Sequence, residues 1–281
     1  MSIDFPGSIE ALSVLRAIEA NLLEWYRFLA SVLPGAEIRE EADMVRTFAP
    51  VDHPGFNAIL QVRFAHGTTR RRIEDALNDL RERGRPGMWW IGPSAHPVDL
   101  ATRLVRHGCL PTDTLVGMAV DLRGGSWKQV AGARGPVPTI RQAVRASELA
   151  EWALPFSEGF GMREDTLRYL APIAAVVSNR AAGPCLRFFL ATLEEGPVAS
   201  CMLYVGAGVA GLYGVATVTR HRNQGYATEV VRAALDVARA EGCRVCVLHA
   251  TPLAVSVYRR LGFVEYCRLR TLTYYPPTRQ Q

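Results

Sequence analysis

Long apolar runs are missing from this sequence. No stretch reaches the roughly 18 to 20 consecutive apolar residues that a transmembrane helix needs. The first six residues, MSIDFP, also lack the basic start and long apolar stretch of a signal peptide. We therefore expect a cytoplasmic protein with no membrane partner.

Paired cysteines are missing as well. Cys243 and Cys246 have a Cys-x-x-Cys spacing, but they cross from a predicted helix end into a strand, and no second pair completes a zinc site. The histidines show no metal-ligand spacing. We expect no metal site, and reduced, buried thiols at all six cysteines: Cys109, Cys185, Cys201, Cys243, Cys246 and Cys267.

Lysine is almost absent, because Lys128 is the only one among 32 basic residues. Residues 1–123 hold 14 basic and 16 acidic side chains, a net charge of −2, whereas residues 124–281 hold 18 and 11, a net charge of +7. The one tight basic cluster, residues 70–72, lies in the acidic part and is not interleaved with aromatics, as nucleic-acid sites are. We expect no nucleic-acid partner.

What the sequence does contain is a loop suited to phosphate. An apolar strand ending near Val218 leads into the pattern Arg222-x-x-Gly225-x-Ala227 and then directly into a helix. The first N–H groups of a helix lack intrahelical partners, and the macrodipole is positive there, so small residues let an anion approach. Arg222 adds a cation that can bind phosphate through two hydrogen bonds.

This segment resembles the GCN5-related N-acetyltransferase (GNAT) superfamily. The acetyl-CoA motif of that family matches Arg222, Gly225 and Ala227 position by position. A second signature follows, in which a helix carries a tyrosine, here Tyr258, four residues before Gly262-Phe263. The resemblance implies an α/β fold with a central mixed β-sheet flanked by helices, and acetyl-CoA as the acyl donor.

The same order of elements is found twice in the chain. Residues 57–64, 70–83, 88–93, 98–106 and 114–122 read as strand, helix, strand, helix and strand, like the segment from the phosphate loop to residue 274. Superposing Gly108 on Gly262 places Leu104 at the tyrosine position, and the phosphate motif is absent. We predict two tandem GNAT-like domains: a degenerate one at 1–123, a Gly/Pro-rich linker at 124–138, and the catalytic domain at 139–281.

Other segments complete the predicted domains. Residues 8–33 have the apolar spacing of a helix. In the catalytic domain we predict a strand at 139–144, a helix with its N-cap at Ser147, a loop at 156–161 that the resemblance places over the substrate, and a helix at 164–177. Three strands follow, at 186–193, 198–205 and 209–218.

The resemblance also assigns roles within the site. Backbone groups of Thr217 to Thr219 would align pantetheine, and an N–H near Val218 would stabilise the oxyanion. Tyr258 would be the general acid for the leaving thiolate, although a packing role on an amphipathic helix also fits its neighbours. The predicted CoA-binding residues are Thr217, Val218, Thr219, Arg222, Asn223, Gln224, Gly225, Tyr226, Ala227, Thr228 and Thr251, the last standing where the family usually has asparagine.

The general base is less clearly marked. Many relatives carry a glutamate on the strand before the phosphate loop, but residues 211–216 contain no carboxylate. His249, at the end of the next strand, has a suitable unperturbed pKa, and Glu158 lies in the predicted substrate loop. A water relay without a single base is the third possibility.

These features predict an N-acetyltransferase that moves an acetyl group to a primary amine of a small molecule, by direct attack in a ternary complex. Two alternatives stay open: other acyl-CoA chemistry on this fold, such as longer acyl transfer or thioester decarboxylation, and a non-catalytic acyl-CoA sensor. We expect a monomer or homodimer.

Overall fold

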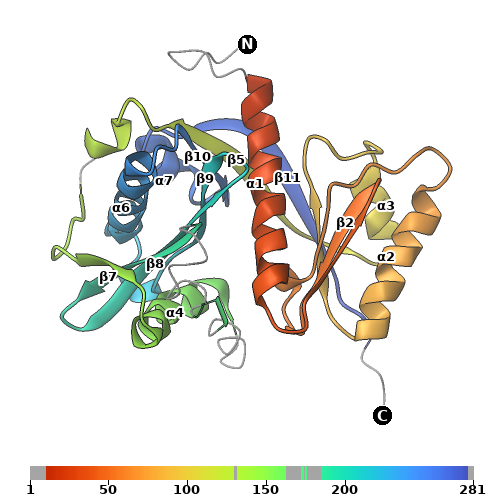
Figure 1. Cartoon of the computed structure of the whole chain (residues 1–281), viewed down its shortest axis with the longest axis horizontal. Coiled ribbons are helices and arrows are strands. Elements are labelled where there is room, and N and C mark those ends of the chain that lie inside the picture. Colours follow the sequence, from red (N-terminus) through yellow and green to blue (C-terminus); the bar gives the residue numbers. More distant parts are fainter. Residues whose placement is uncertain (1–10, 130–131, 163–171, 174, 176–184, 278–281) are drawn as a thin grey trace. The chain divides into compact units, whose positions relative to one another are not determined.

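The computed structural model describes residues 11–129, 132–162, 172–173, 175 and 185–277. Its contacts divide the chain into two compact units (Figure 1). Unit 1 comprises Met1–Leu22 and Gly117–Tyr266, and unit 2 comprises Leu23–Val116 and Cys267–Gln281. No helix of the described residues has the length and hydropathy to cross a membrane.

The boundaries of the two compact units differ from those of the predicted domains, because each unit contains residues from both predicted domains. The chain passes from one unit to the other inside α1 (Ala11–Val32), β5 (Leu110–Asp121) and β11 (Val264–Tyr274). The cause is an exchange of strands: β11, which ends the second repeat, pairs antiparallel with β4 (Gly87–Ile91) of the first. The end of β5, which closes the first repeat, lies beside β10 (Val245–Ala250) of the second.

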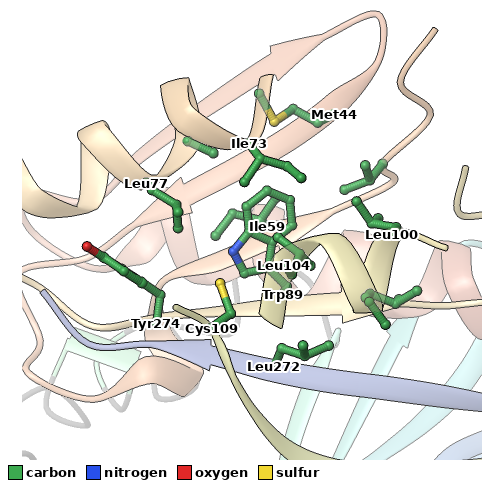
Figure 2. Packing of buried hydrophobic residues seen from close by; sticks show 14 of the residues in the cluster. Met44, Ile59, Ile73, Leu77, Trp89, Leu100, Leu104, Cys109, Leu272 and Tyr274 are labelled. Atoms are coloured by element: carbon green, nitrogen blue, oxygen red, sulfur yellow. The ribbon is translucent and has the colours of Figure 1, made fainter. Parts of the chain in front are cut away.

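Unit 2 contains strands in the order β1-β2-β3-β4-β11, together with α2, α3 and the C-terminal part of α1. Pairing is antiparallel except between β3 and β4, which are parallel. Figure 2 shows its core, in which Trp89 and Leu104 are fully buried. The remaining elements are β1 (Glu37–Glu41), β2 (Met44–Phe48), β3 (Ala58–Leu60), α2 (Thr69–Arg83) and α3 (Leu100–Arg106).

Unit 1 is built on the order β5-β10-β9-β8-β7-β6. Strands β6 to β9 form an antiparallel meander, and β10 joins β9 in parallel. Helices α4 and α6 pack on β7 to β9. The elements are β6 (Thr139–Ala143), α4 (Ala146–Phe160), β7 (Leu186–Leu193), β8 (Gly196–Gly206), β9 (Val209–Thr217), α6 (Tyr226–Ala240) and α7 (Val255–Arg260).

The helix ends of the two repeats share a local geometry. After α3, Gly108 has φ +87° and the Cys109 N–H donates to Leu104 O; after α7, Gly262 has φ +90° and the Phe263 N–H donates to Tyr258 O, both at 3.0 Å. Such left-handed glycines satisfy the last carbonyls of a helix. The superposition of Gly108 on Gly262 made from the sequence is therefore supported by main-chain geometry.

Two predictions about α4 are wrong. The N-cap is Arg145 rather than Ser147, because the Glu148 carboxylate accepts the N–H groups of Val144 and Arg145, at 2.9 and 3.0 Å. The expected loop at 156–161 is mostly helix, since α4 continues to Phe160 and ends at Gly161 with φ +61°. The helix predicted over 164–177 lies outside the described residues, apart from 172, 173 and 175.

Candidate functional site

The site begins where two parallel strands separate. β9 pairs with β8 up to Thr217, but its register with β10 ends at Leu212 and Leu248. A register shift between β8 and β9 bends β9 at this point. Gly214 has φ +57°, and its carbonyl accepts a hydrogen bond from the Ser200 hydroxyl at 3.1 Å. We call this divergence the strand fork. A strand edge without a neighbour offers backbone groups that an extended ligand can bind.

The phosphate loop follows the fork, from η5 (Thr219–His221) to the start of α6. Asn223 and Gly225 have positive φ, +63° and +91°, a backbone conformation that turns successive N–H groups inward. Among the described residues, the N–H groups of 225–228 have no hydrogen-bond acceptor, and the first bond of α6 runs from Glu229 N to Gly225 O at 3.2 Å. These orphan donors fit an anion such as pyrophosphate.

Arg222 and Val218, two other predicted residues of this region, both contact the strands before the loop. The Arg222 side chain is exposed and its Nε donates to Thr217 O at 3.3 Å, so its guanidinium lies beside the end of β9. The Val218 N–H donates to Val198 O at 3.0 Å. The Val218 N–H is therefore engaged beside the end of the β8–β9 ladder, and the oxyanion donor near Val218 stays a prediction.

Glu158 lies in the last turn of α4 and contacts the phosphate loop. Its Oε1 accepts the Thr219 N–H at 2.6 Å. This hydrogen bond, with smaller contributions from Arg220 and Arg222, lowers the pKa of the Glu158 carboxyl below its usual value. A carboxylate held in this way is a poor proton acceptor, so the contacts favour a structural role over the predicted role as base.

Tyr258 is buried in α7, with 7% of its surface exposed. Its ring packs edge-on against Phe263, with centroids 5.7 Å apart. Burial raises the pKa of the Tyr258 phenol, and the nearby thiols of Cys201 and Cys246 raise it further. The phenol therefore stays protonated near neutral pH, as a proton donor must.

His249 lies on β10 directly beyond the strand fork. Its ring faces Tyr213 of β9, with centroids 6.3 Å apart. Burial lowers the pKa of His249 to about 4, so the imidazole is neutral at pH 7. It can accept a proton only weakly.

One buried residue of the site was not predicted from the sequence. Asn21 of α1 is fully buried; its amide nitrogen donates to Gly206 O and Val209 O, at 2.9 and 3.3 Å, and its Oδ1 accepts the Tyr213 hydroxyl at 2.7 Å. A Cβ at Gly211 would lie 2.0 Å from Asn21 Oδ1. The space that a side chain at position 211 of β9 would occupy is thus filled by the Asn21 amide from α1. The sequence feature that could have identified Asn21 is its position as a polar residue on the apolar face of the helix predicted over residues 8–33.

The remaining predicted residues frame the loop. Tyr226 and Thr228 are buried in the first turn of α6, while Thr251 is exposed and its carbonyl accepts the Ala254 N–H at 2.9 Å, before α7. Among the described residues no group of three or more His, Cys, Asp or Glu side chains is placed to hold a metal ion. The six cysteines are free thiols, but only Cys109, Cys201 and Cys246 are buried; the expected burial is wrong for Cys185, Cys243 and Cys267, which are partly exposed.

Comparison with known proteins agrees with this geometry. Residues 146–263 match the model of the Acetyltransferase (GNAT) family. This segment, which contains the fork, the phosphate loop and Tyr258, is a GNAT-family domain, and such a domain supports acyl transfer as the general class of activity. A search of curated protein sequences gave no match.

Solved structures share the fold over nearly the whole chain. A GCN5-related N-acetyltransferase from Kribbella flavida is 18% identical, with a TM-score of 0.64, and the match covers 92% of this chain and 95% of that one. A GCN5-related N-acetyltransferase from Sphaerobacter thermophilus is also 18% identical (TM-score 0.59, covering 94% and 92%). A tandem GNAT protein from the clavulanic acid biosynthesis pathway is 15% identical (TM-score 0.58, covering 94% of each chain). The chain therefore has a tandem GNAT-like fold.

Proposed function

We propose that this protein transfers an acetyl group from acetyl-CoA to the primary amine of a small molecule, by direct attack within a ternary complex. One observation carries the proposal: the strand fork opens immediately before a loop whose N–H groups at 225–228 have no acceptor among the described residues. The fork suits an extended pantetheine arm and the loop suits its pyrophosphate. The GNAT match over 146–263 supports the same ligand.

The side chains around the fork then have distinct tasks. Acetyl-CoA would supply the activated acyl group as a thioester. The amine nitrogen forms a bond to the acyl carbon, the carbon–sulfur bond breaks, and the sulfur takes up a proton while the nitrogen loses one. Tyr258, protonated and buried, is the proposed donor to the sulfur.

We favour His249 over Glu158 as the group that receives the amine proton because of its position at the fork, since the pKa of each group is below its usual value. The His249 ring is neutral at pH 7 and lies at the fork, whereas Glu158 is bound to Thr219. With a pKa of about 4, His249 would pass a proton on to water rather than retain it. This unites two of the possibilities left open by the sequence, a histidine and a water relay.

The test is Tyr258→Phe, measured by free-thiol release from acyl-CoAs with a panel of amines, amino acids, aminoglycosides and peptides. We expect CoA binding by calorimetry to stay within a factor of about two, at one CoA per chain, while kcat falls about 100-fold. Tyr274→Phe in unit 2, which removes a hydroxyl bonded to Arg81, is the matched control. An unchanged kcat in Tyr258→Phe would refute the acid role. Thiol release without an acylated amine would show attack on the thioester by water or another nucleophile and would refute transfer to an amine.

A further inference from the structure

Described residues of the predicted linker contact α6 and the phosphate loop. Trp127 is fully buried and its indole N–H donates to Asp236 Oδ1 at 3.0 Å, on the C-terminal half of the helix. Further along the linker, the Ala133 N–H donates to Glu229 Oε1 at 3.1 Å, in the first turn. The Arg134 N–H then donates to Gln224 O at 2.8 Å, inside the phosphate loop. We call residues 132–135 the strap.

The strap lies in close contact with the loop. A Cβ on Gly225 would be 3.1 Å from Ala133 Cα and 3.3 Å from Gly132 O. Conversely, a Cβ on Gly135 would be 2.7 Å from the Tyr226 hydroxyl and 3.0 Å from Gln224 Oε1. The two segments therefore approach each other through glycines, with no room for a side chain between them.

The strap binds the loop through a carbonyl and leaves its N–H groups free. A trans peptide is planar, and its C=O and N–H point in opposite directions. The bond from Arg134 N–H to Gln224 O therefore aims the next N–H, that of Gly225, away from the strap. Among the described residues that N–H has no acceptor, and it lies at the positive end of α6.

We propose that the strap is a positioning element for the phosphate loop: its Arg134 N–H holds the 224–225 peptide so that the Gly225 N–H faces the bound phosphate. This inference rests on the proposed CoA site. Without the strap, the ligand itself would have to order a loop with two residues at positive φ, Asn223 and Gly225. The linker would thus contribute to CoA affinity without contacting the reacting atoms.

The experiment removes the one N–H that carries the proposal. Arg134→Pro deletes this donor, whereas Arg134→Ala deletes only the side-chain charge. Val137→Pro is the matched control, because Val137 is 91% exposed in the same linker. Gly135→Val, whose side chain would collide with Tyr226 and Gln224, displaces the strap by a second route if Arg134→Pro folds poorly.

Two measurements separate this proposal from the proposed function. Hydrogen exchange of the ligand-free protein should be faster over residues 222–228 in Arg134→Pro than in Val137→Pro. In steady-state assays at 0.3 M salt, Arg134→Pro should raise the KM for acetyl-CoA about 3- to 10-fold, the effect of one hydrogen bond, with kcat at saturation unchanged. Arg134→Ala should change that KM less than about twofold, because salt screens its exposed charge.

Several outcomes would overturn the proposal. Exchange in Arg134→Pro equal to that in Val137→Pro would show that the strap does not hold the loop. An equal rise of KM in Arg134→Ala and Arg134→Pro would assign the effect to charge. A lower KM in Arg134→Pro or Gly135→Val would make the strap an obstacle to CoA. If the wild type binds neither CoA nor inorganic pyrophosphate, the proposed function fails, and the exchange comparison still decides whether the strap orders the loop.

Discussion

Asn21 and Gly211 share one space at the base of the strand fork, and this pair gives a quantitative prediction. Asn21→Ala removes partners from the Tyr213 hydroxyl and from two carbonyls, those of Gly206 and Val209. Each of these three hydrogen bonds contributes about 1 kcal/mol or slightly less, so we expect a loss of about 2 to 3 kcal/mol in the free energy of unfolding.

Gly211→Ala should be more damaging than Asn21→Ala. The new Cβ would lie 2.0 Å from Asn21 Oδ1 and 2.8 Å from Tyr213 Cε2, so the amide must leave and its hydrogen bonds break. Adding about 1 to 3 kcal/mol for overpacking to the loss of the Asn21 hydrogen bonds gives a total of about 3 to 6 kcal/mol. In the double variant the amide is already gone, and the second substitution should cost only about 1 kcal/mol, from the contact with Tyr213.

The assay is urea unfolding of the wild type, both single variants and the double variant. Gly124→Ala is the matched control, because nothing lies within 4 Å of a Cβ at that position. We expect a coupling of about 2 to 5 kcal/mol between Asn21 and Gly211, well above the roughly 0.5 kcal/mol of independent sites. Additive losses would refute the claim that the Asn21 amide fills the space of a side chain at 211.

Two further predictions concern the predicted bases. His249 has a folded pKa of about 4, below the unfolded value near 6.5, so the unfolded state takes up a proton first as the pH falls. The free energy of unfolding should therefore fall by at most about 3 kcal/mol between about pH 6.5 and pH 4. His249→Gln should remove this part of the pH dependence in unfolding titrations. An unaltered pH profile in that variant would contradict the prediction. Glu158→Gln keeps an oxygen acceptor for the Thr219 N–H. The kcat at pH 7 should therefore change less than about threefold, and the KM for acetyl-CoA should change little. A loss of kcat of about 100-fold would instead identify Glu158 as the base.

Local features of the site follow from short stretches of sequence. Gly225 at positive φ before α6, and Gly262 ending α7, need only a few neighbouring residues to form, because helix caps are satisfied within one or two turns. For the same reason the sequence predicts a helix directly after the phosphate loop and a helix that carries Tyr258, and the structure has α6 and α7 there. The position of Tyr258, one turn before the left-handed Gly262, is fixed by this local geometry.

Glu158 shows where local interpretation fails. The glycines at 159 and 161 suggest a loop, yet α4 continues past Gly159 because the helix packs against β9 there: a Cβ on Gly159 would lie 2.5 Å from Ala216 Cβ. The glycine is needed for close approach and not for a turn. This contact brings Glu158 to Thr219, 61 residues further along the chain.

The sequence by itself therefore determined the phosphate loop, its helix, the tyrosine helix and the repeated order of elements, because each depends on hydrogen bonds and periodicity within a short segment. Only the tertiary structure decided where β9 parts from β10, which strand completes each repeat, that Asn21 fills the space beside Gly211, and that the strap reaches Gln224. These contacts join residues far apart in the chain. Their pairing depends on register and packing across the whole sheet, which no local pattern specifies.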